Sequence, residues 1–87
     1  MRSQIIRSID FSAHAEDMLK ERGIAREWVM RVIAAPARTD HKDDGTIHHL
    51  KPIPEHGGRV LRVVMGPDSE PPRVITVFFD RREKGER

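Results

Sequence analysis

The chain contains no cysteine, so it can form neither disulfide bonds nor thiolate metal sites. It also lacks an apolar run near transmembrane length, and no charged-then-apolar signal peptide begins it. A protein without thiols fits a reducing compartment. We therefore expect a cytoplasmic protein with no membrane partner.

Large apolar side chains are scarce as well. Aromatic residues make up 5% of the 87-residue chain, and the hydrophobic share of 37% barely exceeds the charged share of 34%. A chain of this length forms one small domain near the lower limit for an adequate core. We expect a single compact domain over residues 1–80 and a charged tail over residues 81–87. Because the core is thin, a homodimer contact or a partner protein could add stability.

Among the charged residues, arginine dominates the basic set. The net charge is only +2, but twelve of the sixteen basic residues are arginines. The planar guanidinium fork fits phosphate oxygens and stacks on bases, which favours a nucleic-acid partner. A GC-rich genome that prefers arginine codons explains the same bias equally well, and the basic residues form no strongly basic tract.

Two helices are predicted in the first half of the chain. Ser12 is a suitable N-cap for a helix over residues 13–22, because its hydroxyl can accept from the free amides of the first turn. Gly23 is predicted to end this helix in the left-handed conformation. A second helix is predicted over residues 26–34 and stops at Pro36.

Three strands are predicted in the second half. A Gly57-Gly58 turn leads into residues 59–65, and further strands cover residues 46–52 and 73–80. The polar stretch 38–45 is predicted to be a loop that ends in an Asp-Gly reversal. Helices grouped before strands predict an α+β fold, with an N-terminal helix pair packed on one face of an antiparallel sheet of three or four strands.

The expected contacts follow from the alternation of side chains along a strand. The helix residues expected to meet the sheet are Met18, Leu19, Trp28, Val29 and Val32, and the sheet residues expected to meet them are Leu61, Val63, Ile75 and Val77. The last strand is also apolar on its other face, at Val74 and Phe78. Another element, a second copy or a partner is expected to cover those two residues.

Arg62 is anomalous, since it lies between two valines on a largely apolar face of its strand. One interpretation is structural: its methylenes cover apolar surface while the guanidinium reaches water. The other is that a rigid strand holds it as a ligand for phosphate or carboxylate. The sequence leaves both interpretations open.

The histidines do not predict a metal site. His48 and His49 are neighbours that point to opposite faces of a strand, so they cannot share one ion there. The chain has no cysteine and no H-x-x-x-H spacing on a predicted helix. We predict no metal and no other cofactor.

Several short motifs, in order and at their spacing, resemble a bacterial family that is known only as a domain of unknown function, with an F-S-x-H-A helix start and a closing V-T-V-type strand. The likeness covers nearly the whole chain and rests on Phe11-Ser12-Ala13-His14-Ala15, Arg22-Gly23-Ile24, Pro36, Asp44-Gly45, Lys51, Arg62-Val63-Val64 and Val74-Ile75-Thr76-Val77. More distantly, the chain resembles the RelE, ParE and BrnT toxins, compact helix-pair-plus-sheet proteins of which several cut RNA. It departs from the expected pattern at Asp17, where a basic residue is expected, and at Ala25, where a capping serine is expected.

The resemblance implies a RelE-like fold and a metal-independent endoribonuclease. Cleavage by the 2′-hydroxyl needs a base, an acid and cations around the phosphate. His14 is the candidate base, because the positive end of its helix keeps the ring neutral. Arg62 and Lys51 are the candidate catalytic cations, and Arg22 and Arg59 the candidate substrate-binding residues. His14 could instead be a solvent-facing or cap-related residue.

Two functions from different classes follow. The first is a RelE-like toxin that cuts RNA, free or on the ribosome, and is neutralised by an antitoxin protein. The second is a non-catalytic domain that binds a protein or nucleic acid through the face that carries Arg62. Asp17 removes one expected phosphate ligand, which counts against the first function.

Overall fold

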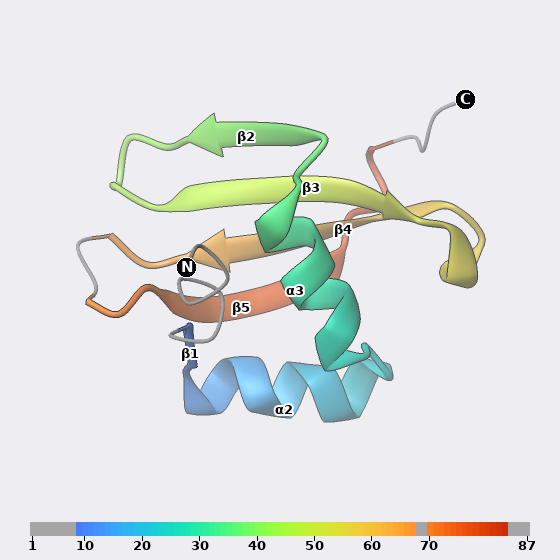
Figure 1. The fold of residues 1–87 in the computed structure, drawn as a ribbon, viewed down its shortest axis with the longest axis horizontal. Helices are drawn as coiled ribbons and strands as arrows, with labels where there is room; N and C mark the ends of the chain where they lie inside the picture. Colours follow the sequence, from blue (N-terminus) through green and yellow to red (C-terminus); the bar gives the residue numbers. More distant parts are fainter. Residues whose placement is uncertain (1–8, 68–69, 84–87) are drawn as a thin grey trace.

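The computed structural model describes residues 9–67 and 70–83, which form two α-helices and a five-stranded sheet (Figure 1). The elements in chain order are β1 (Asp10–Phe11), α2 (Ala13–Arg22), α3 (Arg26–Ala34), β2 (Arg38–His41), β3 (Ile47–Ile53), the 3₁₀ turn η1 (Pro54–His56), β4 (Arg59–Met65) and β5 (Arg73–Phe79). Both helices have the predicted bounds, and the three predicted strands agree with β3, β4 and β5 to within one residue.

The capping residues of α2 behave as predicted. The Ser12 hydroxyl accepts from the Ala15 amide at 3.0 Å and donates to the Ile75 carbonyl at 3.1 Å. Gly23 is left-handed, with φ of 63°, and its amide donates to the Leu19 carbonyl. The cap therefore both starts the helix and ties it to β5.

The predicted sheet is wrong, because the sheet has five strands and is mixed. Its order is β1-β5-β4-β3-β2. β1 pairs with β5 in parallel, and the Asp10 and Ser12 amides donate to the carbonyls of Pro72 and Val74, each at 2.9 Å. A two-residue strand is too short to show an alternating pattern in the sequence, so only the tertiary pairing reveals it.

β2 is the second unexpected strand, in the stretch predicted to be a loop. Arg38–His41 pairs antiparallel with β3, and the chain reverses through Asp43-Asp44-Gly45. Gly45 has φ of 91°, which a residue with a Cβ rarely adopts. β2 is an outer strand and carries only polar side chains, so its sequence resembles a loop.

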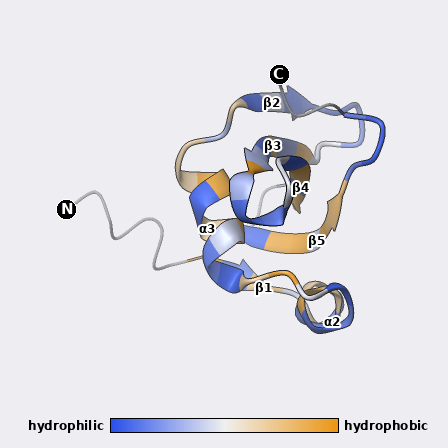
Figure 2. Ribbon diagram, turned by 90° about the vertical axis from the view of Figure 1, so that its right-hand side faces the viewer, coloured by the Kyte–Doolittle hydropathy of each residue, from blue (hydrophilic) through white to orange (hydrophobic). Residues whose placement is uncertain are grey.

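The helices do not form a pair on one face of the sheet, which is a further correction. α3 lies on one face, whereas α2 runs beside the β5 edge (Figures 1 and 2). The parallel pairing of β1 with β5 brings the chain to this edge immediately before α2 begins. The face of the sheet that α3 covers is called the near face below, and the opposite face is called the far face.

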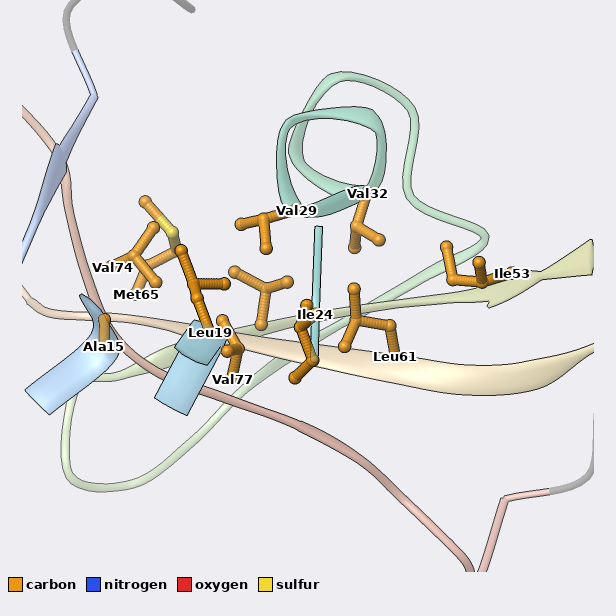
Figure 3. Close-up of a cluster of buried hydrophobic side chains, with 11 residues drawn as sticks. Ala15, Leu19, Ile24, Val29, Val32, Ile53, Leu61, Met65, Val74 and Val77 are labelled. Carbon is orange, nitrogen blue, oxygen red and sulfur yellow. The ribbon is translucent and has the colours of Figure 1, made fainter. Parts of the chain in front are cut away.

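The core lies between α3, α2 and the near face of the sheet (Figure 3). Leu61 and Val63 point into it from β4, as predicted, and Met65 joins them. On β5, however, Val74 is fully buried in the core while Ile75 is half-buried, the reverse of the prediction. A register shift next to Met65 causes this exchange, because Val64 pairs with Thr76 and Met65 with Val74, which skips Ile75.

No helix within residues 9–67 and 70–83 is long and apolar enough to span a bilayer.

Candidate functional site

Arg62 is buried at the centre of the far face. Its side chain is 9% exposed and lies between Val60 and Val64, which are also buried. The Nε atom donates to Asp80 Oδ2 at 2.8 Å, one terminal nitrogen donates to His48 Nδ1 at 2.9 Å, and the other lies 3.5 Å from Glu83 Oε2. The guanidinium therefore binds carboxylates of its own chain rather than reaching water.

Arg62 also determines the tautomer of His48. A guanidinium has no lone pair to offer, so His48 Nδ1 must accept and Nε2 must carry the proton. Nε2 then donates to the Thr46 hydroxyl at 3.2 Å, and that hydroxyl donates to Asp44 Oδ1 at 2.6 Å. Burial first, and then the positive charge of Arg62, lower the pKa of His48 below its ordinary value. His48 is therefore a neutral ring with both nitrogens engaged.

The turn after β5, residues 80–83, carries the two carboxylates that bind Arg62. Asp80 Oδ1 accepts from the Arg82 amide at 3.0 Å, and the Glu83 amide donates to the Asp80 carbonyl at 3.2 Å. Both terminal nitrogens of Arg38, on β2, donate hydrogen bonds to the Glu83 carboxylate, at 2.9 and 3.2 Å. Burial would raise the pKa of Asp80, but the Arg82 amide and the Arg62 guanidinium together hold it below its usual range. Asp80 is thus ionised, and both carboxylates of the turn are paired with arginines.

A cavity of about 300 Å³ opens beside this turn, lined by Arg59, Phe79, Asp80, Arg81 and Glu83. Its two carboxylates are already neutralised by Arg62 and Arg38. Its two arginines are exposed and form no ion pair with any residue in the described part of the chain. The cavity therefore presents two uncompensated cations, which suits an anionic ligand.

An aromatic group adjoins the cavity through Phe79. The rings of Phe79 and His56 are stacked, with centroids 4.3 Å apart and planes 19° apart. Trp28 of α3 lies 6.2 Å from Phe79 in an edge-on arrangement and 5.8 Å from His56. All three rings are half-buried, so the group has a core side and an accessible side.

The sheet keeps two of the predicted catalytic residues, Lys51 and Arg62, apart. Lys51 pairs with Leu61 on the near face, and its Nζ donates to the Ala35 carbonyl at 2.8 Å. Arg62 lies on the far face, so the sheet separates these two cations. His14 is exposed at the start of α2, where its Nε2 lies 3.1 Å from the Thr76 hydroxyl.

The predicted substrate-binding residues come from different elements, and only one of them lines the cavity. Arg22 is exposed in the last turn of α2. Arg59 lines the cavity. The sequence predicts no role at a site for Arg81, Phe79 or His56, because Arg81 belongs to the predicted charged tail, Phe79 lies within a predicted strand and His56 precedes the Gly57-Gly58 turn. The only local signal was the Gly57-Gly58 turn, which places His56 and Arg59 at one end of the sheet.

Metal ligation has no support in the residues that the structure describes, where no three histidine or acidic side chains gather around one point.

Comparison with known proteins places the chain in one family. A family model described as a domain of unknown function (DUF4258) matches residues 11–79. No curated protein and no solved structure matches the chain significantly.

Proposed function

The chain belongs to the DUF4258 family of domains of unknown function, and we propose that it binds single-stranded RNA at the cavity beside Arg59 and Arg81. The observation that carries the proposal is the pair of exposed arginines on a cavity whose carboxylates are already paired. Arginine forks fit phosphate oxygens, and a strand of RNA offers one phosphate per nucleotide. The distant resemblance to RNA-cutting toxins makes RNA the polymer to test first.

The arrangement of charges favours a phosphate polymer over an acidic protein surface. Elsewhere on the described surface, most arginines are engaged, since Arg26, Arg31, Arg38 and Arg73 each pair with a carboxylate. Arg59 and Arg81 differ because the fold brings them to one cavity and leaves both guanidinium groups available. Next to them lies a ring system on which bases can stack.

Fluorescence anisotropy with a labelled eight-nucleotide RNA, titrated at several salt concentrations, tests this proposal. Arg59→Ala and Arg81→Ala are each expected to weaken binding and to make the salt dependence shallower by about 0.7 in log–log slope, the value for one phosphate contact on a single strand. Arg73→Ala is the matched control, because Arg73 is an exposed arginine at the opposite end of β5, roughly 20 Å away.

The proposal fails if the wild-type protein does not bind the RNA at low salt, or if all three arginine variants bind alike. A DNA strand of the same sequence serves as a second probe. Tighter binding to DNA would transfer the proposal from RNA to DNA.

Cleavage of the bound RNA is a second candidate function, and His14 is the residue that favours it. The ring is exposed in the first turn of α2, and its Nδ1 atom makes no hydrogen bond to the described residues. Such a nitrogen could take the 2′-hydroxyl proton. The cations would have to be other than Arg62 and Lys51, which are engaged on opposite faces.

Inducible expression with a growth readout tests this second function, and an antitoxin protein would be the natural partner of such a toxin. Wild type is expected to arrest growth, and His14→Ala is expected to abolish the arrest. His41→Ala, a change at an exposed histidine of β2, is the control. Equal toxicity of wild type and His14→Ala would exclude His14 as the base.

A further inference from the structure

The stacked rings of His56 and Phe79 come from two elements that the fold holds rigidly. His56 ends η1, and Arg31 of α3 grips Glu55 of the same turn through both terminal nitrogens, at 2.7 and 2.8 Å. These hydrogen bonds lower the pKa of Glu55 to about 2, so the Arg31–Glu55 ion pair persists at any ordinary pH. Phe79 is the last residue of β5 and pairs with Leu61 in the core. The ring pair is therefore pre-formed.

Phe79 lies between the core and the cavity, and His56 is stacked on it. Phe79 packs against the core residues and also lines the cavity, and Trp28 closes the core side of the group. Arg81 follows Phe79 by two residues, and Arg59 follows His56 by three. The two free cations are therefore tethered to the same two segments as the two stacked rings.

We propose that this cavity takes an unpaired nucleobase, which stacks on the Phe79–His56 ring pair while Arg59 and Arg81 hold the flanking phosphates. This inference rests on the proposed RNA binding and specifies its substrate class as a strand with accessible bases. Any base has a face that can stack on an aromatic ring, so the contact selects single strands without selecting a sequence. Bases within a duplex are already stacked on their neighbours and cannot enter the cavity.

The competing explanation is that the rings only complete the core. In that case the cavity would bind phosphates alone, and the bases of the ligand would not matter. The two explanations differ in what happens when the bases are removed from the ligand while its phosphates are kept.

Trp28 provides the readout, because it is the only tryptophan in the chain and touches the ring group. Its emission reports stacking, and the fluorescence anisotropy of each labelled probe reports affinity, during titration with three probes: an eight-nucleotide oligo(A) RNA, an abasic phosphodiester strand of the same length, and an eight-base-pair duplex. We expect oligo(A) to change the emission and to bind most tightly. The abasic strand is expected to bind more weakly and to leave the emission unchanged, and the duplex is expected to bind weakest at the cavity.

The matched variants are Phe79→Leu and Phe78→Leu, adjacent residues whose side chains point to opposite faces of β5. Phe79→Leu is expected to lower the affinity for oligo(A) roughly tenfold, the loss of one base–aromatic stack, while affinity for the abasic strand and the salt slope stay unchanged. Phe78→Leu should change none of these. His56→Ala repeats the test at a half-buried ring on a turn, in case Phe79→Leu does not fold.

Three outcomes overturn the inference. If the abasic strand binds as tightly as oligo(A), or if Phe79→Leu and His56→Ala leave the preference for oligo(A) intact, the bases do not stack here and the proposed RNA binding still stands. If no probe binds to the wild-type protein, both proposals fail.

Discussion

Every nitrogen of the Arg62 guanidinium is engaged within the protein. Its three partners come from two other segments: His48 from β3, and Asp80 and Glu83 from the turn after β5. A buried carboxylate left without its arginine would carry an uncompensated charge. Arg62 thus stabilises the far face by fastening the last turn to the sheet.

Replacement of Arg62 is expected to lower stability according to how many of its three partners the new side chain can still bind. Arg62→Lys keeps a charge but reaches one partner at a time, so we expect the free energy of unfolding to fall by about 1–3 kcal/mol. Arg62→Ala leaves Asp80 buried and unpaired and is expected to cost about 3–5 kcal/mol. Chemical denaturation measures both, with Arg59→Ala as an exposed control. Denaturation curves of Arg62→Ala and Arg59→Ala that coincide would contradict the role assigned to Arg62.

His48 is expected to make stability depend on pH. Its pKa in the folded protein lies below the ordinary value of 6.5, so the unfolded chain takes up a proton more readily. The stabilisation is complete above pH 6.5 and is lost as the pH falls through the folded-state pKa. Protonation would also place a hydrogen on Nδ1, which faces the Arg62 guanidinium.

Thermal unfolding between pH 7.5 and 5 measures this effect. The wild-type melting temperature is expected to fall more over this range than that of His48→Gln, which cannot titrate. Burial also lowers the pKa of His49, so part of the fall should remain in the variant. His41→Gln, at an exposed ring, is the control. A parallel fall in wild type and His48→Gln would show that His48 does not titrate with folding.

At the scale of the elements, the register shift in the β4–β5 pair decides which side chains of β5 enter the core. Strict alternation from Phe79 would place Ile75 there, but the shift places Val74 there instead. Nothing in a run of branched apolar residues distinguishes these two registers, because either face of the strand could be buried. The sequence therefore predicts the strand and not its register.

Alanine substitutions at these two positions test the register. Val74→Ala removes two methyl groups from a fully buried site and is expected to lower the free energy of unfolding by about 2 kcal/mol. Ile75→Ala removes more carbon but at a half-buried site, so it is expected to cost less. Urea denaturation compares the two variants. A larger loss for Ile75→Ala would mean that the shift is absent in solution.

At the scale of the whole molecule, Val74 needs no partner, because the core already covers it. Phe78 is different: it is half-buried on the far face, across from Arg62. The expectation that a second copy or a partner covers this residue stays a prediction. A partly exposed apolar ring on a sheet face that no helix covers is a common feature of contact surfaces.

Sedimentation velocity at increasing protein concentration tests self-association through this residue. The sedimentation coefficient of the wild type is expected to rise with concentration, and that of Phe78→Ser to rise less. Coefficients that stay constant for both proteins would rule out a homodimer through the far face, and a partner protein would then be the remaining candidate.

The sequence by itself determined the parts of the fold that depend on neighbouring residues. α2 begins after Ser12 and ends at Gly23, and Pro36 follows α3. Runs of branched side chains form β4 and β5. Each of these signals acts over a few residues, because capping hydrogen bonds and backbone preferences are local.

Only the tertiary structure decided how these elements meet. β1 and β5 pair across more than sixty residues, and the partners of Arg62 lie 14, 18 and 21 residues away along the chain. The cavity likewise joins Arg59 to the segment 79–83. Contacts of this kind depend on strand register and sheet order, and the combined packing of the whole core sets both. No short stretch of sequence therefore predicts them.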